Sequence, residues 1–149
     1  QIRKIFSVFD KRQICIDYFD NCYMISLGND CYDAKEFEEL CDRALREKYE
    51  NIETLEKAYL KYNGLFLEEN GWIWSIYYQG MLEFKYTDIL EHLIEWYAKI
   101  DRQDKLFECV KKMIERVSED EHLKKKYISI LNKQLGVQKT KLLIKNIEN

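Results

Sequence analysis

The feature that most constrains this 149-residue sequence is that it contains no proline. Proline is the commonest helix breaker, because it lacks a backbone N–H and its ring clashes with the preceding turn. Without proline, only glycines and capping residues can end a helix, and the chain has just five glycines. We therefore expect a mainly α protein with long helices.

One segment has the two-residue alternation of a β-strand instead of helical spacing. The alternating apolar residues lie on both sides of Phe19-Asp20-Asn21 and are Ile14, Ile16, Tyr18, Tyr23, Ile25 and Leu27. This pattern predicts a β-hairpin over residues 13–27. Because a lone hairpin is only marginally stable in water, we expect it to rest on the helices or on a partner chain.

Beyond residue 32 the apolar spacing changes to about 3.6 residues, the period of an α-helix. The predicted helix starts are Asp33, Asn51, Asp101 and Ser118, which forms a capping box with Glu121, and the predicted ends are Gly64 and Gly136. One long helix, or two helices joined end to end, is predicted over residues 72–100. A last helix is predicted to carry Leu142, Leu143 and Ile147.

The later helices are similar to one another at a fixed distance along the chain. Leu93 and Tyr97 are matched 34 residues further on by Tyr127 and Leu131. A period near 34 with antiparallel helix pairs is typical of tetratricopeptide-like repeats, in which each pair buries its apolar face only against the next. The predicted fold is therefore mainly α, with tetratricopeptide-like antiparallel helical repeats and a small N-terminal β-hairpin.

The charge of the chain limits its partners. A net charge of −3 argues against a protein whose main task is to neutralise phosphates, so any nucleic-acid contact has to be local. The first twelve residues are locally basic and contain one acidic residue; their basic residues are Arg3, Lys4, Lys11 and Arg12. The sequence has no apolar run long enough to span a bilayer, and its start at Gln1 does not resemble a signal peptide. We expect no membrane span, and a sequence that begins inside a longer protein.

No catalytic or metal-binding pattern stands out. The five cysteines are Cys15, Cys22, Cys31, Cys41 and Cys109, without a CxxC pair, and the two histidines are His92 and His122. Zinc spacings and the GxSxG, HExxH, P-loop and GxGxxG motifs are missing. The acidic pairs Glu38/Glu39 and Glu68/Glu69 are typical of solvated surfaces. We therefore expect free thiols, surface histidines, a cytoplasmic location, no cofactor, no metal and no enzyme activity.

Several motifs, in order along the chain, are similar to those of one known family. The matches are Cys22-Tyr23-Met24-Ile25 to a Gly-Tyr-x-Leu strand, Asp33-Ala34-Lys35-Glu36-Phe37-Glu38 to a D-x-x-x-F-E helix start, Tyr62-Asn63-Gly64-Leu65-Phe66-Leu67 to Y-x-G-x-F-L, Trp74 to a following tryptophan, and Ser118-Glu119-Asp120-Glu121 to an acidic cap. Residues 22–136 thereby resemble the bacterial transcriptional activator domain. This tetratricopeptide-like module follows a winged-helix DNA-binding domain in SARP-type regulators.

The resemblance also implies a division of the chain. Ile2-Arg3-Lys4-Ile5-Phe6 is similar to the end of a winged-helix recognition helix, written L-R-K-x-L. Residues 1–30 would then be the end of the DNA-binding domain, including its wing hairpin, and residues 31–149 the activator domain. The residues implied to meet DNA phosphates in the intact protein are Arg3, Lys4, Lys11 and Arg12.

Two groups of residues are singled out by these patterns. Those predicted to seal joints between helix pairs are Tyr62, Gly64, Phe66, Leu67 and Trp74. Those predicted to line a partner groove are Trp72, Tyr78 and Tyr86, with simple inter-helix packing as the other interpretation. The first functional hypothesis is a fragment of a bacterial transcription regulator whose helical module binds a protein partner or itself. The alternative is a stand-alone tetratricopeptide-like adaptor that binds a peptide or protein without DNA.

Overall fold

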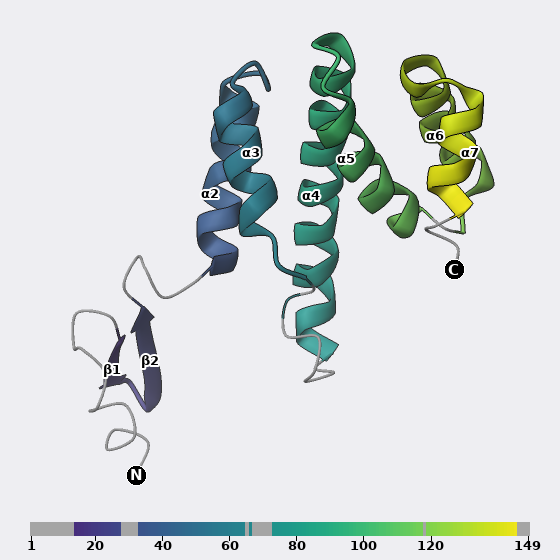
Figure 1. The fold of residues 1–149 in the computed structure, drawn as a ribbon. Helices are drawn as coiled ribbons and strands as arrows, with labels where there is room; N and C mark the ends of the chain where they lie inside the picture. Colours follow the sequence, from purple (N-terminus) through teal and green to yellow (C-terminus); the bar gives the residue numbers. More distant parts are fainter. Residues whose placement is uncertain (1–13, 28–32, 65, 67–72, 118, 146–149) are drawn as a thin grey trace.

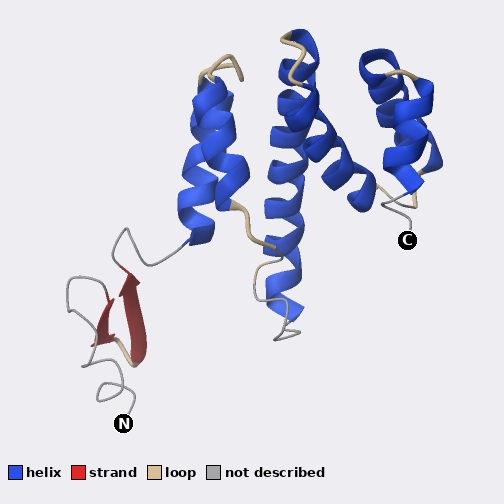
Figure 2. Cartoon of the chain, in the orientation of Figure 1, coloured by secondary structure: helices blue, strands red, loops and turns tan. Residues whose placement is uncertain are grey.

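In a computed structural model of the protein, the described residues are 14–27, 33–64, 66, 73–117 and 119–145. They form a hairpin followed by a series of helices, as Figure 1 and Figure 2 show. The elements are β1 (Ile14–Phe19), β2 (Cys22–Leu27), α2 (Asp33–Arg46), α3 (Ile52–Lys61), α4 (Ile73–Lys99), α5 (Gln103–Arg116), α6 (Glu121–Leu135) and α7 (Val137–Lys145). The prediction of a mainly α fold with a small N-terminal hairpin is confirmed.

The hairpin is closed by a turn that suits its two central residues. Phe19 pairs with Cys22, and Asp20 and Asn21 between them take positive φ angles of 49° and 62°. Two successive positive φ angles make the type I′ turn, which matches the twist of the strands and which Asp and Asn tolerate. The side chains of residues 17–24 are all exposed, and Figure 1 shows the hairpin apart from the helices. Over these residues, therefore, the hairpin does not rest on the helices; cover by a partner chain stays a prediction.

Several helix boundaries lie where the capping residues predict them. Asn51 caps α3, because its side-chain oxygen accepts a hydrogen bond from the backbone N–H of Glu53 at 3.1 Å. Gly136 ends α6 with a φ of 81°, and its N–H donates to the carbonyl of Asn132. Helix α3 ends at Lys61, slightly before the predicted Gly64.

Two predicted caps are wrong. Asp101 does not cap α5: it lies in the turn with a φ of 55°, and Arg102 occupies the N-cap position without a side-chain hydrogen bond. Ser118 lies outside the described residues, and the N-cap of α6 is Asp120, whose carboxylate accepts hydrogen bonds from the N–H groups of His122 and Leu123. In both cases the chain starts its helix one or two residues later than the sequence pattern indicates.

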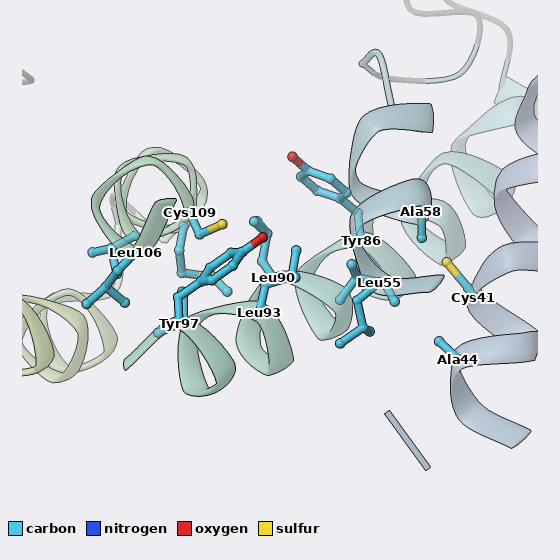
Figure 3. Close-up of a cluster of buried hydrophobic side chains, with 14 of the residues drawn as sticks. Cys41, Ala44, Leu55, Ala58, Tyr86, Leu90, Leu93, Tyr97, Leu106 and Cys109 are labelled. Carbon is cyan, nitrogen blue, oxygen red and sulfur yellow. The ribbon is translucent and has the colours of Figure 1, made fainter. Parts of the chain in front are cut away.

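Helix α4 is the longest of the described helices and lies in the middle of the helical body (Figure 1). Successive helices alternate in direction, and each packs on the next; α2 also contacts α4. The buried side chains of α4, each at most 4% exposed, are Leu82, Tyr86, Ile89, Leu90, Leu93, Ile94 and Tyr97. Figure 3 shows how some of them meet side chains from α2, α3 and α5, such as Cys41, Leu55 and Leu106. The repeat relation between helix pairs stays a prediction.

Tyrosine hydroxyls join the helices at the edges of this core. Within the described ranges, six of them donate a hydrogen bond to a carboxylate of another element, and five of the six pairs involve α4. The pairs are Tyr49 with Asp88, Tyr59 with Glu108, Tyr62 with Glu83, Tyr78 with Glu38, Tyr97 with Glu56, and Tyr127 with Glu91. Hydrogen bonds to ionised acceptors are stronger than neutral ones. These pairs therefore fix the register of α4 against its neighbours.

The packing predicts a large difference between two leucines. Leu93 is fully buried in the core, whereas Leu60 on α3 is 72% exposed. Leu93→Ala should lower the free energy of unfolding by about 2–5 kcal/mol, because it removes buried methyl groups and leaves a cavity. Leu60→Ala should change it by about 0.5 kcal/mol or less. Urea unfolding followed by circular dichroism measures both, and equal losses would show that α4 is not the centre of the core.

The tyrosines also predict loss of stability in alkaline solution. Burial raises the pKa of Tyr49 and of Tyr86 from the ordinary value of 10.0 to about 12, and for Tyr49 a hydrogen bond to Asp88 adds to it. Burial likewise raises the pKa of Tyr59, Tyr62, Tyr97 and Tyr127. A raised folded-state pKa stabilises the fold below the unfolded pKa, and this contribution is lost as pH rises. The urea midpoint should therefore fall steeply from about pH 10 to pH 12. A midpoint that stays constant over this range would contradict the burial of these phenols.

Candidate interaction surface on helix α4

A row of residues runs along α4 about half a turn around the helix from the core residues Leu82, Tyr86 and Leu93. It is spaced alternately by four and three positions and consists of Ile73, Tyr77, Gly80, Phe84, Thr87, Glu91, Ile94 and Ala98. This spacing keeps the residues on one stripe and is the spacing that helices use when they pack side by side. This row is termed the outer seam of α4.

Helix α6 contacts the C-terminal half of the outer seam, and an apolar groove between the two helices is lined by residues that include Ile94, Ala98 and Ile130. The Tyr127 hydroxyl donates to Glu91 at 2.5 Å, and the Gln134 amide donates to the carbonyl of Ala98 at 3.0 Å. Both pairs are separated by 36 residues in the sequence, so α6 runs parallel to α4 along this half. At this contact Ile94 is only 1% exposed. The seam is thus a surface on which a helix packs.

The N-terminal half of the same seam is open. Ile73 and Tyr77 are each 85% exposed, Phe84 is 75% exposed, and Ile76 beside the seam is 60% exposed. A Cβ atom added at Gly80 would meet no heavy atom of the described structure within 4 Å. The ten residues 73–82 include no charged side chain. Contiguous exposed apolar residues without charges are typical of the central part of a protein interface.

The residues beside the open half are held by contacts inside the chain. The Glu83 carboxylate accepts a hydrogen bond from the Tyr62 hydroxyl and lies 2.7 Å from Nε of Arg116. The guanidinium carbon of Arg116 is 4.5 Å from the centroid of the Tyr86 ring, on which Tyr62 stacks at 4.2 Å. On another side of the helix, Gln79 donates to the carbonyl of Phe66. The open half is therefore presented on a helix whose position is fixed.

The structure separates the three residues predicted to line a partner groove. Trp72 lies outside the described residues. Tyr78 is half-buried, and its hydroxyl donates to Glu38 at 2.5 Å. Tyr86 is 1% exposed, so its ring belongs to the core and is out of reach of a surface partner; this part of the prediction needs correction. The exposed side chains of the region are instead those of Ile73, Tyr77 and Phe84, which sequence reasoning missed.

The residues predicted to seal helix joints are described in part. Tyr62 is half-buried against Tyr86, and the ring of Phe66 meets that of Tyr78 edge to face, with 4.8 Å between centroids. Gly64 is exposed and takes a φ of 136°, which other residues rarely adopt. Leu67 and the side chain of Trp74 lie outside the part of the chain that the structure describes. So do the predicted DNA-contacting residues Arg3, Lys4, Lys11 and Arg12.

Other candidate groups take structural positions. Cys22, Cys41 and Cys109 are free, as predicted, and burial raises the pKa of the last two to about 12, so they stay protonated near neutral pH. His122 is exposed, whereas His92 is half-buried and stacks on Tyr49 with 3.7 Å between ring centroids. Among the described residues no group of three or more His, Cys, Asp or Glu side chains could hold a metal ion, and no helix is long and apolar enough to cross a membrane.

Comparisons of this chain with protein-family models, with curated proteins and with solved structures found no match. The resemblance to the bacterial transcriptional activator domain therefore depends on the quoted sequence motifs, and the chemistry of the chain has to be argued from its own surface. The open half of the outer seam is an apolar surface of α4 that the packing of the described helices leaves exposed.

Two aromatic residues of α4 test this placement. Phe84→Gln should change the free energy of unfolding by about 0.5 kcal/mol or less, because the ring is 75% exposed. Tyr86→Ala should lower it by about 3–5 kcal/mol, because the ring is buried. Both are measured by urea unfolding at low protein concentration, where association between chains does not contribute. A loss for Phe84→Gln as large as that for Tyr86→Ala would show that the open half is packed inside the chain.

Proposed function

We propose that this chain is the helical interaction module of a bacterial transcription regulator, and that it acts through protein contacts on the open half of the outer seam. The observation that carries the proposal is the exposure of Ile73, Tyr77 and Phe84 along one stripe of α4, whose residues 73–82 include no charged side chain. Apolar side chains on water-exposed helix surfaces are normally scattered, and a contiguous row of them gains free energy when a partner removes it from water.

The regulatory part of the proposal is supported by the N-terminal region. The hairpin exposes the apolar side chains of Phe19 and Tyr23, by 77% and 69%, and a two-stranded hairpin alone is marginal in water. A wing that packs on the rest of a winged-helix domain would have its cover in the intact protein. The Y-x-G-x-F-L segment, Tyr62-Asn63-Gly64-Leu65-Phe66-Leu67, is the sequence motif that links this hairpin to an activator domain.

The DNA contact is tested on the intact gene product. Immunoprecipitation of the tagged protein with its DNA should enrich a small set of promoters. Changing Arg3 and Lys4 together to alanine should lower that enrichment. In a salt titration of DNA binding, the same change should lower the slope of log affinity against log salt by about two, because two phosphate contacts are lost. An intact protein that enriches no promoter would favour the adaptor hypothesis.

The protein contact is tested in the same cells. Phe84→Glu places a charge on the open half without touching the core, and it should reduce the transcriptional response of the genes whose promoters are enriched. Leu142→Glu is the matched control, because Leu142 is a 69% exposed apolar residue on α7, far along the chain from the seam. Equal responses in wild type and Phe84→Glu, with equal protein levels, would show that the seam has no part in regulation.

A further inference from the structure

We propose that the partner of the open half is the same surface on a second copy of this chain, so that two α4 helices pack antiparallel about a two-fold axis. The inference rests on the proposed function, because it names the occupant of the surface argued there. It follows from the continuity of the seam, the lack of charge over residues 73–82, the size pattern of the residues in the open half and the area that this half offers.

The open half continues an interface that the chain already forms. On its C-terminal half the outer seam packs against α6, with Ile94 buried and Glu91 bonded to Tyr127. The open positions Ile73, Tyr77, Gly80 and Phe84 continue this stripe with unchanged spacing and carry no charged side chain. A stripe spaced by four and three residues matches another helix better than a strand or a loop, since a helix presents side chains at the same spacing.

The lack of charge in the open half limits which partner surface can match it. Residues 73–82 include no charged side chain that could attract an oppositely charged partner. Any charge that a partner placed against this segment would be buried without a counter-ion. The matching surface has to be an apolar, uncharged helix face, and α4 itself is such a face. An antiparallel arrangement also sets the dipoles of the two helices in opposite directions, which is favourable.

The order of large and small residues along the open half favours one register of the two helices. A two-fold axis between positions 78 and 79 places Tyr77 opposite Gly80 of the partner subunit, and Ile73 opposite Phe84 of the partner subunit. Beyond the adjacent turns of α4 itself, no heavy atom of the described residues lies within 4 Å of a Cβ placed on Gly80, so the tyrosine ring has room at this point. With the axis shifted by two positions, Tyr77 would face Phe84 and the glycine gap would stay unfilled. Close packing therefore favours the first register.

The open half offers enough apolar area for a reversible dimer. An aromatic side chain buries roughly 150–250 Å² in an interface, so Tyr77 and Phe84, with the two isoleucines Ile73 and Ile76, offer roughly 500 Å² on each copy. Because a two-fold contact uses the same patch twice, the total reaches about 1,000 Å², the lower limit for a specific interface. A reversible dimer with a dissociation constant of roughly 1–100 µM is expected from such a surface.

Sedimentation equilibrium measures this association. The wild-type chain should be a dimer at the top of a concentration series and a monomer at its bottom. Phe84→Glu should raise the dissociation constant about 100-fold or more, because each copy would bury an unpaired charge. Leu142→Glu should leave it unchanged. Circular dichroism and urea unfolding check that every variant keeps the fold.

The register is tested by exchanging the two central residues. Tyr77→Gly and Gly80→Tyr should each weaken the dimer about tenfold or more, the first by removing the ring and the second by a clash with Tyr77 of the partner subunit. In the double variant the ring again lies opposite a glycine, so dimerisation should return. A double variant as weak as the single ones would overturn the register, and with it the antiparallel pairing proposed for the seam.

The failure of this inference and that of the proposed function give different results. A wild-type chain that remains monomeric at concentrations on the order of 1 mM overturns the dimer. If Phe84→Glu still lowers the transcriptional response in cells, the open half binds a different protein and the proposed function stands. If the wild type dimerises but Phe84→Glu changes neither association nor transcription, both proposals fail.

Discussion

The arrangement of the helices depends on one requirement: a tyrosine that buries its ring at a helix contact still needs a partner for its hydroxyl. In the described chain, carboxylates of neighbouring elements supply that partner, most often across α4. Tyr97 illustrates the arrangement, because its ring is buried while its hydroxyl reaches Glu56 on α3 at 2.6 Å. Apolar packing thereby supplies most of the stability, and the hydroxyl bonds select one register among those that similar packing would allow.

A helix held in this way can leave part of its surface uncovered without losing its position. The C-terminal half of α4 is packed by α6 on its outer side, whereas its N-terminal half lies open there, with Tyr77 and Phe84 in water. Glu83, held by Arg116 and Tyr62, fixes the helix beside the open side chains. The open half is therefore a preformed surface, and a partner that binds it has little ordering entropy to overcome.

Sequence reasoning predicted the hairpin, its turn and the helices, because alternation and glycine or asparagine punctuation are local signals. It failed where the answer depends on neighbours. Asp101 comes before α5 and Asp120 comes before α6, but only Asp120 caps its helix. The conformation of each turn decides whether the carboxylate can accept hydrogen bonds from the first N–H groups of the helix. Phe84 and Tyr86 are only two positions apart on a helix that is apolar nearly all round, so the pattern does not show which ring faces the core. The spacing of the outer seam and the lack of charge over residues 73–82 were the signals available for the open half.

Helix α4 consists of one half packed on both sides and one half open on its outer side. Amide hydrogen exchange of the dilute monomer, read residue by residue by NMR, tests this arrangement most directly. Amides of residues 86–97 should exchange only through global unfolding, with the same free energy as urea unfolding gives, because other helices pack on two sides of this half of α4. Amides of residues 77–84 should exchange through a smaller local opening. Equal protection along the whole helix, or stronger protection in its N-terminal half, would contradict the account.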